Sequence, residues 1–228
     1  FPLGAYFGKN LVLEVYRQLM NFIYSLSCMC IDCKCNECIM QTSCRYFHLS
    51  GHNFTGYPGI IIKNDIFNQS KFNKNDEMKF TFYVIGDCAD LIAFIDIFFH
   101  DYLNQKICGQ FFQLKEAKTT EIESKTVCFK HLFIKTPVEG VDFKLIYNSM
   151  VEFYNQEYKT NFNKINNCGK LSNPMRISSE LVYFKTRFIR QNGYIGEVNF
   201  ENEVELESEL TLIGFGKYNY IGGGSFEA

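Results

Sequence analysis

The chain has 228 residues, 46% of them hydrophobic, which is enough for one large domain or two small ones, each with its own core. The formal net charge of −2 argues against a protein that simply coats nucleic acid, because binding to phosphate backbones needs clustered Lys and Arg. No signal peptide is visible, and no apolar run approaches the roughly 18 residues that span a membrane. We therefore expect a cytoplasmic protein with no membrane partner.

In the first half, residues 11–27 predict an amphipathic helix, because apolar residues recur at spacings of three and four. A cysteine-rich segment, residues 28–44, follows this helix directly, and no obvious strand precedes it. The remaining predicted elements of this half are strands at 60–62, 78–85 and 108–115 and an amphipathic helix at 88–103.

The second half repeats the order of the first. Its predicted elements are a strand at 126–135, a helix at 142–158, strands at 178–189 and 194–199, and a short apolar turn at 210–214 in the place of a second helix. An acidic stretch runs from Glu197 to Glu209. The pattern predicts an α+β protein with two ferredoxin-like β-α-β-β-α-β domains in tandem. We expect an N-terminal domain over 1–118 and a C-terminal domain over 119–228, joined near the polar segment 116–125.

Six cysteines lie between residues 28 and 44, and they include the C-x-x-C pairs Cys30/Cys33 and Cys35/Cys38. In a chain without a secretion signal, such clusters are more typical of metal sites than of disulfides. Thiolates at this spacing suit a structural, tetrahedral zinc ion inserted in the first domain. An iron–sulfur cluster and a set of reduced thiols are the alternatives. The expected zinc ligands are Cys28 or Cys30 together with Cys35, Cys38 and Cys44.

Three segments, taken in order, resemble a known family. The first is Cys35-x-x-Cys38-x5-Cys44-x-Tyr46, which follows the N-terminal helix. The second is Arg187-x-x-Arg190-Gln191 ahead of Gly193-x-x-Gly196, and the third is the closing run LTLIGFGKYNYIGGGSF. Together they resemble the CRISPR-associated repeat-RNA-processing endoribonucleases of the RAMP superfamily, in the branch with a cysteine-rich knuckle. The chain departs from the family pattern at Phe188-Ile189, where a small polar residue is usual, and at its end, where the family continues into further glycines.

This resemblance implies a tandem ferredoxin-like fold that binds the stem-loop of a CRISPR repeat RNA. It also implies cleavage of that RNA to mature guide RNA by attack of a 2′-hydroxyl, without a metal in the chemistry. His48 and His52 are the candidate proton-transfer residues, since an imidazole titrates near neutral pH. Tyr6 is a further catalytic candidate, because some family members use Tyr or Lys. The expected RNA-binding residues are Lys185, Arg187, Arg190, Gly222, Gly223 and Gly224.

Two other functions remain open at this point. The first is a non-catalytic RNA-binding subunit of a CRISPR effector complex, which the four histidines and the negative net charge favour. The second is a zinc-stabilised protein-interaction module with no affinity for RNA. None of these alternatives requires DNA as a partner.

Overall fold

The computed structural model describes residues 1–7, 11–28, 35–47, 49, 57–64, 71–167, 169–184, 187–221 and 223–227. Buried side chains from both halves of the chain form one continuous hydrophobic core. None of the helices in this described part is both long and apolar enough to cross a bilayer.

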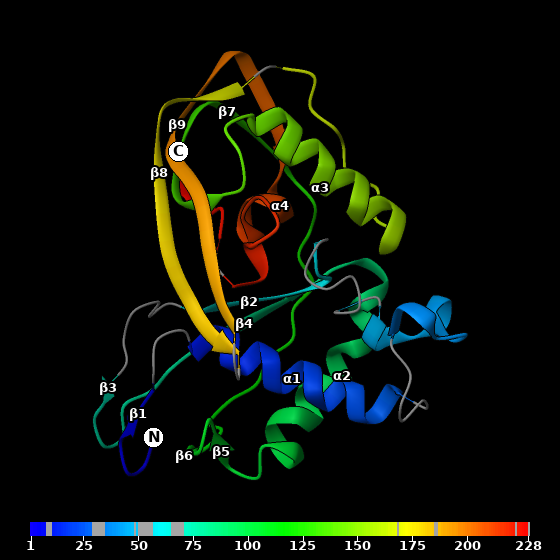
Figure 1. The fold of residues 1–228 in the computed structure, drawn as a ribbon, viewed down its shortest axis with the longest axis vertical. Helices are drawn as coiled ribbons and strands as arrows, with labels where there is room; N and C mark the ends of the chain where they lie inside the picture. The colour runs from blue at the N-terminus through cyan, green and yellow to red at the C-terminus, as the bar shows by residue number, and fades with distance from the viewer. Residues whose placement is uncertain are drawn as a thin grey trace.

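A four-stranded antiparallel sheet forms the C-terminal half (Figure 1). Its strands are β7 (Thr126–Val138), β8 (Gly169–Phe184), β9 (Arg187–Glu207) and β10 (Phe226–Glu227), arranged in the order β10-β7-β9-β8. Helix α3 (Phe143–Glu157) connects β7 to β8, and α4 (Ser208–Ile213) connects β9 to β10. This half therefore has the β-α-β-β-α-β connectivity that the sequence predicts, and the predicted turn at 210–214 is a short helix.

Both helices of this half lie on the same side of the sheet (Figure 1). The side chains of β7 alternate, so that Leu132 and Ile134 are buried while Phe133 is exposed. Helix α3 begins at an N-cap, Asp142, whose carboxylate accepts a hydrogen bond of 3.0 Å from the Leu145 amide. The buried residues of α3 recur at intervals of three and four positions, as expected for a helix packed on a sheet. The buried residues of α3 are Phe143, Ile146, Tyr147, Met150, Val151 and Tyr154.

The N-terminal half is built around α1 (Leu11–Ser27) and an antiparallel pair, β2 (Ile60–Asn64) with β4 (Phe80–Val84). Ile60, Ile61 and Ile62 are all fully buried, because α1 and the turn at Asn219–Ile221 both pack against β2. The predicted helix at 88–103 is divided into a 3-10 turn (Gly86–Leu91), α2 (Ile92–Ile97) and a π-helical turn (Phe98–Tyr102).

Four shorter strands complete this half in two pairs. β1 (Ala5–Tyr6) pairs with β3 (Lys71–Phe72), and β5 (Lys106–Ile107) pairs with β6 (Gln110–Phe111). The described residues of the N-terminal half thus form separate two-stranded pairs rather than one four-stranded sheet. A first ferredoxin-like domain over 1–118 stays a prediction. The expected boundary falls in residues 112–125, which have no regular secondary structure.

The two halves meet through aromatic and amide side chains. The ring of Tyr16 on α1 lies 4.9 Å from the ring of Tyr220, centroid to centroid. The neighbouring Asn219 is fully buried, and its amide donates a hydrogen bond of 2.8 Å to Tyr154 Oη on α3. This packing fixes the last turn of the chain against both α1 and α3.

Candidate nucleic-acid interface

The glycine-rich turn between α4 and β10 brings two stretches of backbone into direct contact. Gly214, Gly216 and Gly224 have φ angles of 82°, 84° and 64°, in the left-handed region that glycine enters without steric cost. The Phe215 amide donates a hydrogen bond of 3.0 Å to Gly224 O. A Cβ atom on Gly224 would lie 1.7 Å from Phe215 O, so only glycine fits there.

The end of β7 holds this turn in place. Ser225 O accepts a hydrogen bond of 2.8 Å from the Lys135 amide, and the Ser225 amide donates one of 2.7 Å to Thr136 Oγ1. Further along, the Glu139 carboxylate accepts the Lys217 amide with both oxygens, at 3.1 and 3.2 Å. The shape of the turn therefore depends on the residues that end β7.

The N-terminal half contributes two side chains to the same place. Lys63 Nζ on β2 donates to Ser225 Oγ at 3.4 Å, and Tyr57 Oη donates to Glu139 Oε1 at 3.3 Å. Burial lowers the pKa of Lys63 from 10.5 to about 8. Burial, followed by the negative charge of Glu139, raises the pKa of Tyr57. We refer to Lys63, Gly223, Gly224 and Ser225 as the Lys63 junction.

The Lys63 junction suits an anionic ligand. No ion pair formed by the described residues includes Lys63, and desolvation alone accounts for its lowered pKa. A partly buried ammonium group without a carboxylate partner gains from a phosphate more than an exposed lysine does, because it is poorly hydrated. The Ser225 hydroxyl lies beside it, while the backbone of Gly223 and Gly224 is buried and hydrogen-bonded to Tyr218 and Phe215, so these glycines set the shape of the turn.

The predicted RNA-binding residues fall in two places. Gly223 and Gly224 belong to the Lys63 junction, whereas Gly222 and Lys185 lie outside the described residues. Arg187 and Arg190 are on β9, opposite Phe184 and Glu180 of β8. In Figure 1 this end of the β8–β9 hairpin points toward the N-terminal half.

The predicted catalytic residues are not assembled by the described part of the chain. His48 and His52 lie outside it, so their roles stay predictions. Tyr6 is on β1 with 68% of its surface exposed, and Figure 1 places β1 well away from the glycine-rich turn, beyond β2 and β4. The structure instead brings Lys63 to the turn. No sequence motif identifies this residue, and the one local sign of it is a lysine directly after three consecutive isoleucines.

In the cysteine segment, three described thiols lie near that of Cys35. Burial is the first cause of the raised pKa of the Cys35 thiol, and the neighbouring Cys28, Cys44 and Cys38 also raise it. None of the described cysteines forms a disulfide. Within the described ranges, no three His, Cys, Asp or Glu side chains converge closely enough to be a metal site, and Cys30 lies outside those ranges. As a donor set, four neighbouring thiols fit the tetrahedral sulfur coordination of zinc.

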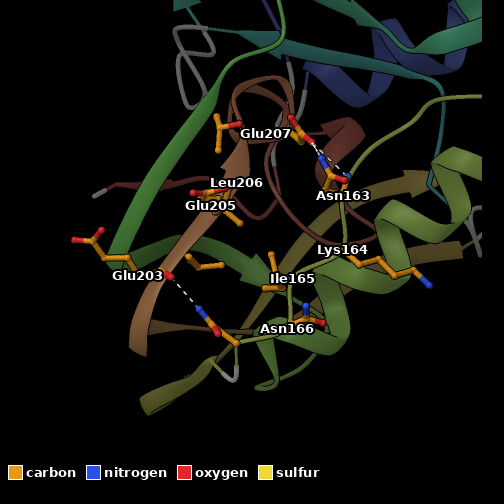
Figure 2. A pocket seen from close by; sticks show the side chains of 11 residues that line it. Asn163, Lys164, Ile165, Asn166, Glu203, Glu205, Leu206 and Glu207 are labelled. Carbon is orange, nitrogen blue, oxygen red and sulfur yellow. Dashed lines mark hydrogen bonds between the residues drawn. The ribbon is translucent and has the colours of Figure 1, made fainter.

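A separate hollow lies between β9 and the asparagine-rich segment after α3 (Figure 2). Glu203, Glu205 and Glu207 contribute to its lining. The Glu207 carboxylate is engaged by Asn163, whose backbone and side-chain amides donate at 3.3 and 2.8 Å. Asn167 Nδ2 donates to Glu203 O at 2.8 Å. Carboxylates repel RNA phosphates, so this hollow is unsuited to RNA, and its hydrogen bonds fix the loop onto β9.

Comparison with known proteins gives a structural match only. No protein-family model and no curated protein sequence matches the chain. One solved structure that resembles it is described as "An RAMP protein binding different RNA substrates". The two share 15% sequence identity with a TM-score of 0.50, and the match covers 98% of this chain and 93% of that one. Because the match extends over nearly the whole of both chains, this protein has the α+β fold of that RAMP protein.

Proposed function

We propose that this protein binds RNA, and that its RNA is the structured repeat of a CRISPR transcript. The observation that carries the proposal is the fold shared with an RNA-binding RAMP protein over 98% of the chain. The order of the sequence motifs described above supports the narrower assignment to the CRISPR repeat. A tandem ferredoxin-like arrangement belongs to the same proposal, with the N-terminal pairs of strands as a reduced first domain.

The Lys63 junction is the proposed contact with the RNA backbone. Its ammonium and hydroxyl groups would bind a phosphate, the buried glycines would set the shape of the turn that carries the hydroxyl, and the two halves of the chain both contribute to it. Arg187 and Arg190 on β9 are the proposed additional phosphate contacts. Recognition of the repeat would then combine a backbone clamp at the turn with cations along one strand.

We further propose that the protein cleaves the RNA it binds. The 2′-oxygen forms a bond to phosphorus while the bond from phosphorus to the 5′-oxygen breaks, which yields a 2′,3′-cyclic phosphate and a 5′-hydroxyl. A base accepts the 2′-hydroxyl proton and an acid protonates the 5′-oxygen, and His48 and His52 are the proposed residues. Lys63 would stabilise the additional negative charge on the phosphorane oxygens.

One observation favours a second candidate, a non-catalytic RNA-binding subunit. Of the histidines in the described part of the chain, His100 lies on the π-helical turn 3.5 Å from Asp96, and His131 lies on β7 opposite Asn199. Neither imidazole is at the Lys63 junction. If His48 and His52 are also distant from it, the protein would hold the RNA without cutting it.

A single set of assays separates these functions. The purified protein is mixed with a labelled repeat stem-loop from its own genome, in EDTA and over a range of salt concentrations. Cleavage that is lost when the scissile 2′-hydroxyl is replaced by hydrogen would support the endoribonuclease. Salt-dependent binding without product would support the binding subunit. Unchanged fluorescence anisotropy at low salt would refute both and leave the zinc-stabilised protein-interaction module.

The cysteine segment is the proposed site of one structural zinc ion. Its ligands would be Cys35, Cys38 and Cys44 together with Cys28 or Cys30. Cys28, Cys38 and Cys44 each lie near enough to Cys35 to raise the pKa of its thiol, which supports this set. When bound, zinc would supply folding free energy to a short segment with little core of its own.

A further inference from the structure

Four short strands of the N-terminal half lie side by side. β1 pairs with β3, β5 pairs with β6, and β1 is in contact with β6. Side chains alternate across strands, so one set faces the core and the other faces solvent. Ala5, Phe72 and Ile107 are the inward set, with 8%, 3% and 2% of their surfaces exposed. The core beneath these strands is therefore complete without the outward-facing side chains.

The outward set contains two aromatic rings, each paired across its strands with a lysine. Tyr6 is the cross-strand partner of Lys71, and Phe111 is the cross-strand partner of Lys106. Tyr6 is 68% exposed and Phe111 is 47% exposed. Lys106 Nζ lies 4.8 Å from the centroid of the Phe111 ring, a cation–π contact. We call Lys71, Tyr6, Phe111 and Lys106 the aromatic–lysine row.

We infer that the aromatic–lysine row binds a single-stranded segment of RNA, by stacking bases on Tyr6 and Phe111. Exposed aromatic rings bind unpaired bases because every base presents a π face, and flanking cations attract the phosphates between them. This inference rests on the proposed RNA-binding function. The inference adds a second RNA-contacting surface, away from the Lys63 junction. This surface suits the unpaired flank of a structured RNA.

Charge around the row is consistent with this ligand. Glu77, which lies just beyond β3, forms an ion pair with Lys115, so its charge is compensated. The carboxylates of β9 line the hollow on the C-terminal half instead. An acidic protein segment would also be attracted to the lysines, but it would leave the two ring faces unused. RNA uses both features of the row.

The test compares two labelled RNAs on the full chain by fluorescence anisotropy. One is the repeat stem-loop alone, and the other carries an unpaired flank of about eight nucleotides. Tyr6→Ala and Phe111→Ala should each weaken binding of the flanked RNA by roughly 5- to 100-fold, the usual loss for one stacked base. Binding of the bare stem-loop should not change. Tyr6→Phe, which keeps the ring, should bind as the wild type does.

The matched control is Phe133→Ala, because Phe133 is also an exposed phenylalanine, 43% accessible, but lies on β7 of the other half. It should bind both RNAs normally. Wild-type protein that binds the flanked RNA while both alanine variants bind it equally well would overturn this inference and leave RNA binding intact. Wild-type protein that binds neither RNA would overturn the proposed function as well. If an alanine variant fails to fold, the wild type is cross-linked by ultraviolet light to an RNA that carries 4-thiouridine in its flank. A cross-link to β1 or β6 would support the inference, and no cross-link there would overturn it.

Discussion

Lys63→Met should stabilise the protein and weaken its binding to RNA. The Lys63 ammonium group is partly buried, and burial lowers its pKa from 10.5 to about 8. That difference corresponds to about 3 kcal/mol of destabilisation below pH 8, since each pKa unit is worth about 1.4 kcal/mol. Methionine has a similar shape and no charge. We therefore expect the free energy of unfolding to rise by up to about 3 kcal/mol at pH 7.

The pH dependence follows from the same pKa values. On raising the pH, folded protein loses the Lys63 proton near pH 8, whereas unfolded protein keeps it to about pH 10.5. Between these values the unfolded state binds more protons, so the stability of the wild type rises with pH. The variant lacks this contribution. Its advantage over the wild type should be largest below pH 8 and should disappear by about pH 10.5.

Urea unfolding at pH 7 and pH 10 measures the change in stability, and fluorescence anisotropy of labelled repeat RNA measures the change in affinity. RNA affinity should fall about 10-fold or more, as expected for one lost charge-assisted contact. Lys170→Met is the matched control, because Lys170 is exposed, and its stability should change by less than about 0.5 kcal/mol. A Lys63→Met protein that is less stable at pH 7, or whose advantage grows with pH, would refute the burial argument. A more stable variant with unchanged affinity for RNA would remove Lys63 from the phosphate site.

Three further predictions concern the fold around the turn and the cysteine segment. Asn219→Ala should lower the free energy of unfolding by about 2–4 kcal/mol in a denaturant titration, because it removes the amide that donates to the buried Tyr154 hydroxyl at 2.8 Å. A loss below about 1 kcal/mol would contradict the importance of this hydrogen bond. Gly224→Ala should lower the free energy of unfolding by more than about 3 kcal/mol, since its Cβ would lie 1.7 Å from a backbone oxygen. Gly109→Ala, at φ 80° with nothing within 4 Å, should lower it by only about 1–2 kcal/mol, from backbone strain. Equal losses in the two variants would argue against the clash. Elemental analysis should find one zinc per chain, and a chelator should lower the thermal unfolding midpoint. Cys38→Ser should abolish the bound zinc and the effect of the chelator, while Cys128→Ser, at an exposed cysteine, should keep both. A metal-free chain whose midpoint is unchanged by chelator would refute the zinc site.

Local periodicity was sufficient to predict the main helices and the order of elements in the C-terminal half, but the strand predicted at 178–189 is wrong, because it spans the end of β8 and the start of β9. The predicted helix at 11–27 coincides with α1, and that at 142–158 differs from α3 by one residue at each end. Both have apolar residues at spacings of three and four, which tertiary packing then reinforces. The strand predicted at 126–135 is confirmed as β7, although it continues to Val138.

The acidic stretch conceals the second half of β9. Residues after 199 were interpreted as a run of charge, yet β9 continues to Glu207. Val204 and Leu206 are buried, whereas Glu203 and Glu205, which alternate with them, are exposed, so the segment has the period-two pattern of a strand. β1 was missed for a different reason: two residues are too few to show any period, and only pairing with β3 defines the strand.

The candidate site was less predictable than the fold. Gly223 and Gly224 were identified by their resemblance to a family pattern, and the structure places them at the junction. Lys63 had no comparable pattern, because its burial depends on the approach of a distant segment and not on its neighbours in sequence. Tyr6 lies exposed on β1, and its catalytic role stays a prediction.

The hydrogen bond between Lys63 and Ser225 joins residues that are 162 positions apart. Contacts of such long range form late, because closing a long loop costs entropy before any contact stabilises it. The burial of the Lys63 ammonium group accompanies the contact between β2 and the turn at Asn219–Ile221. The geometry proposed for phosphate binding therefore depends on both halves of the chain being folded together.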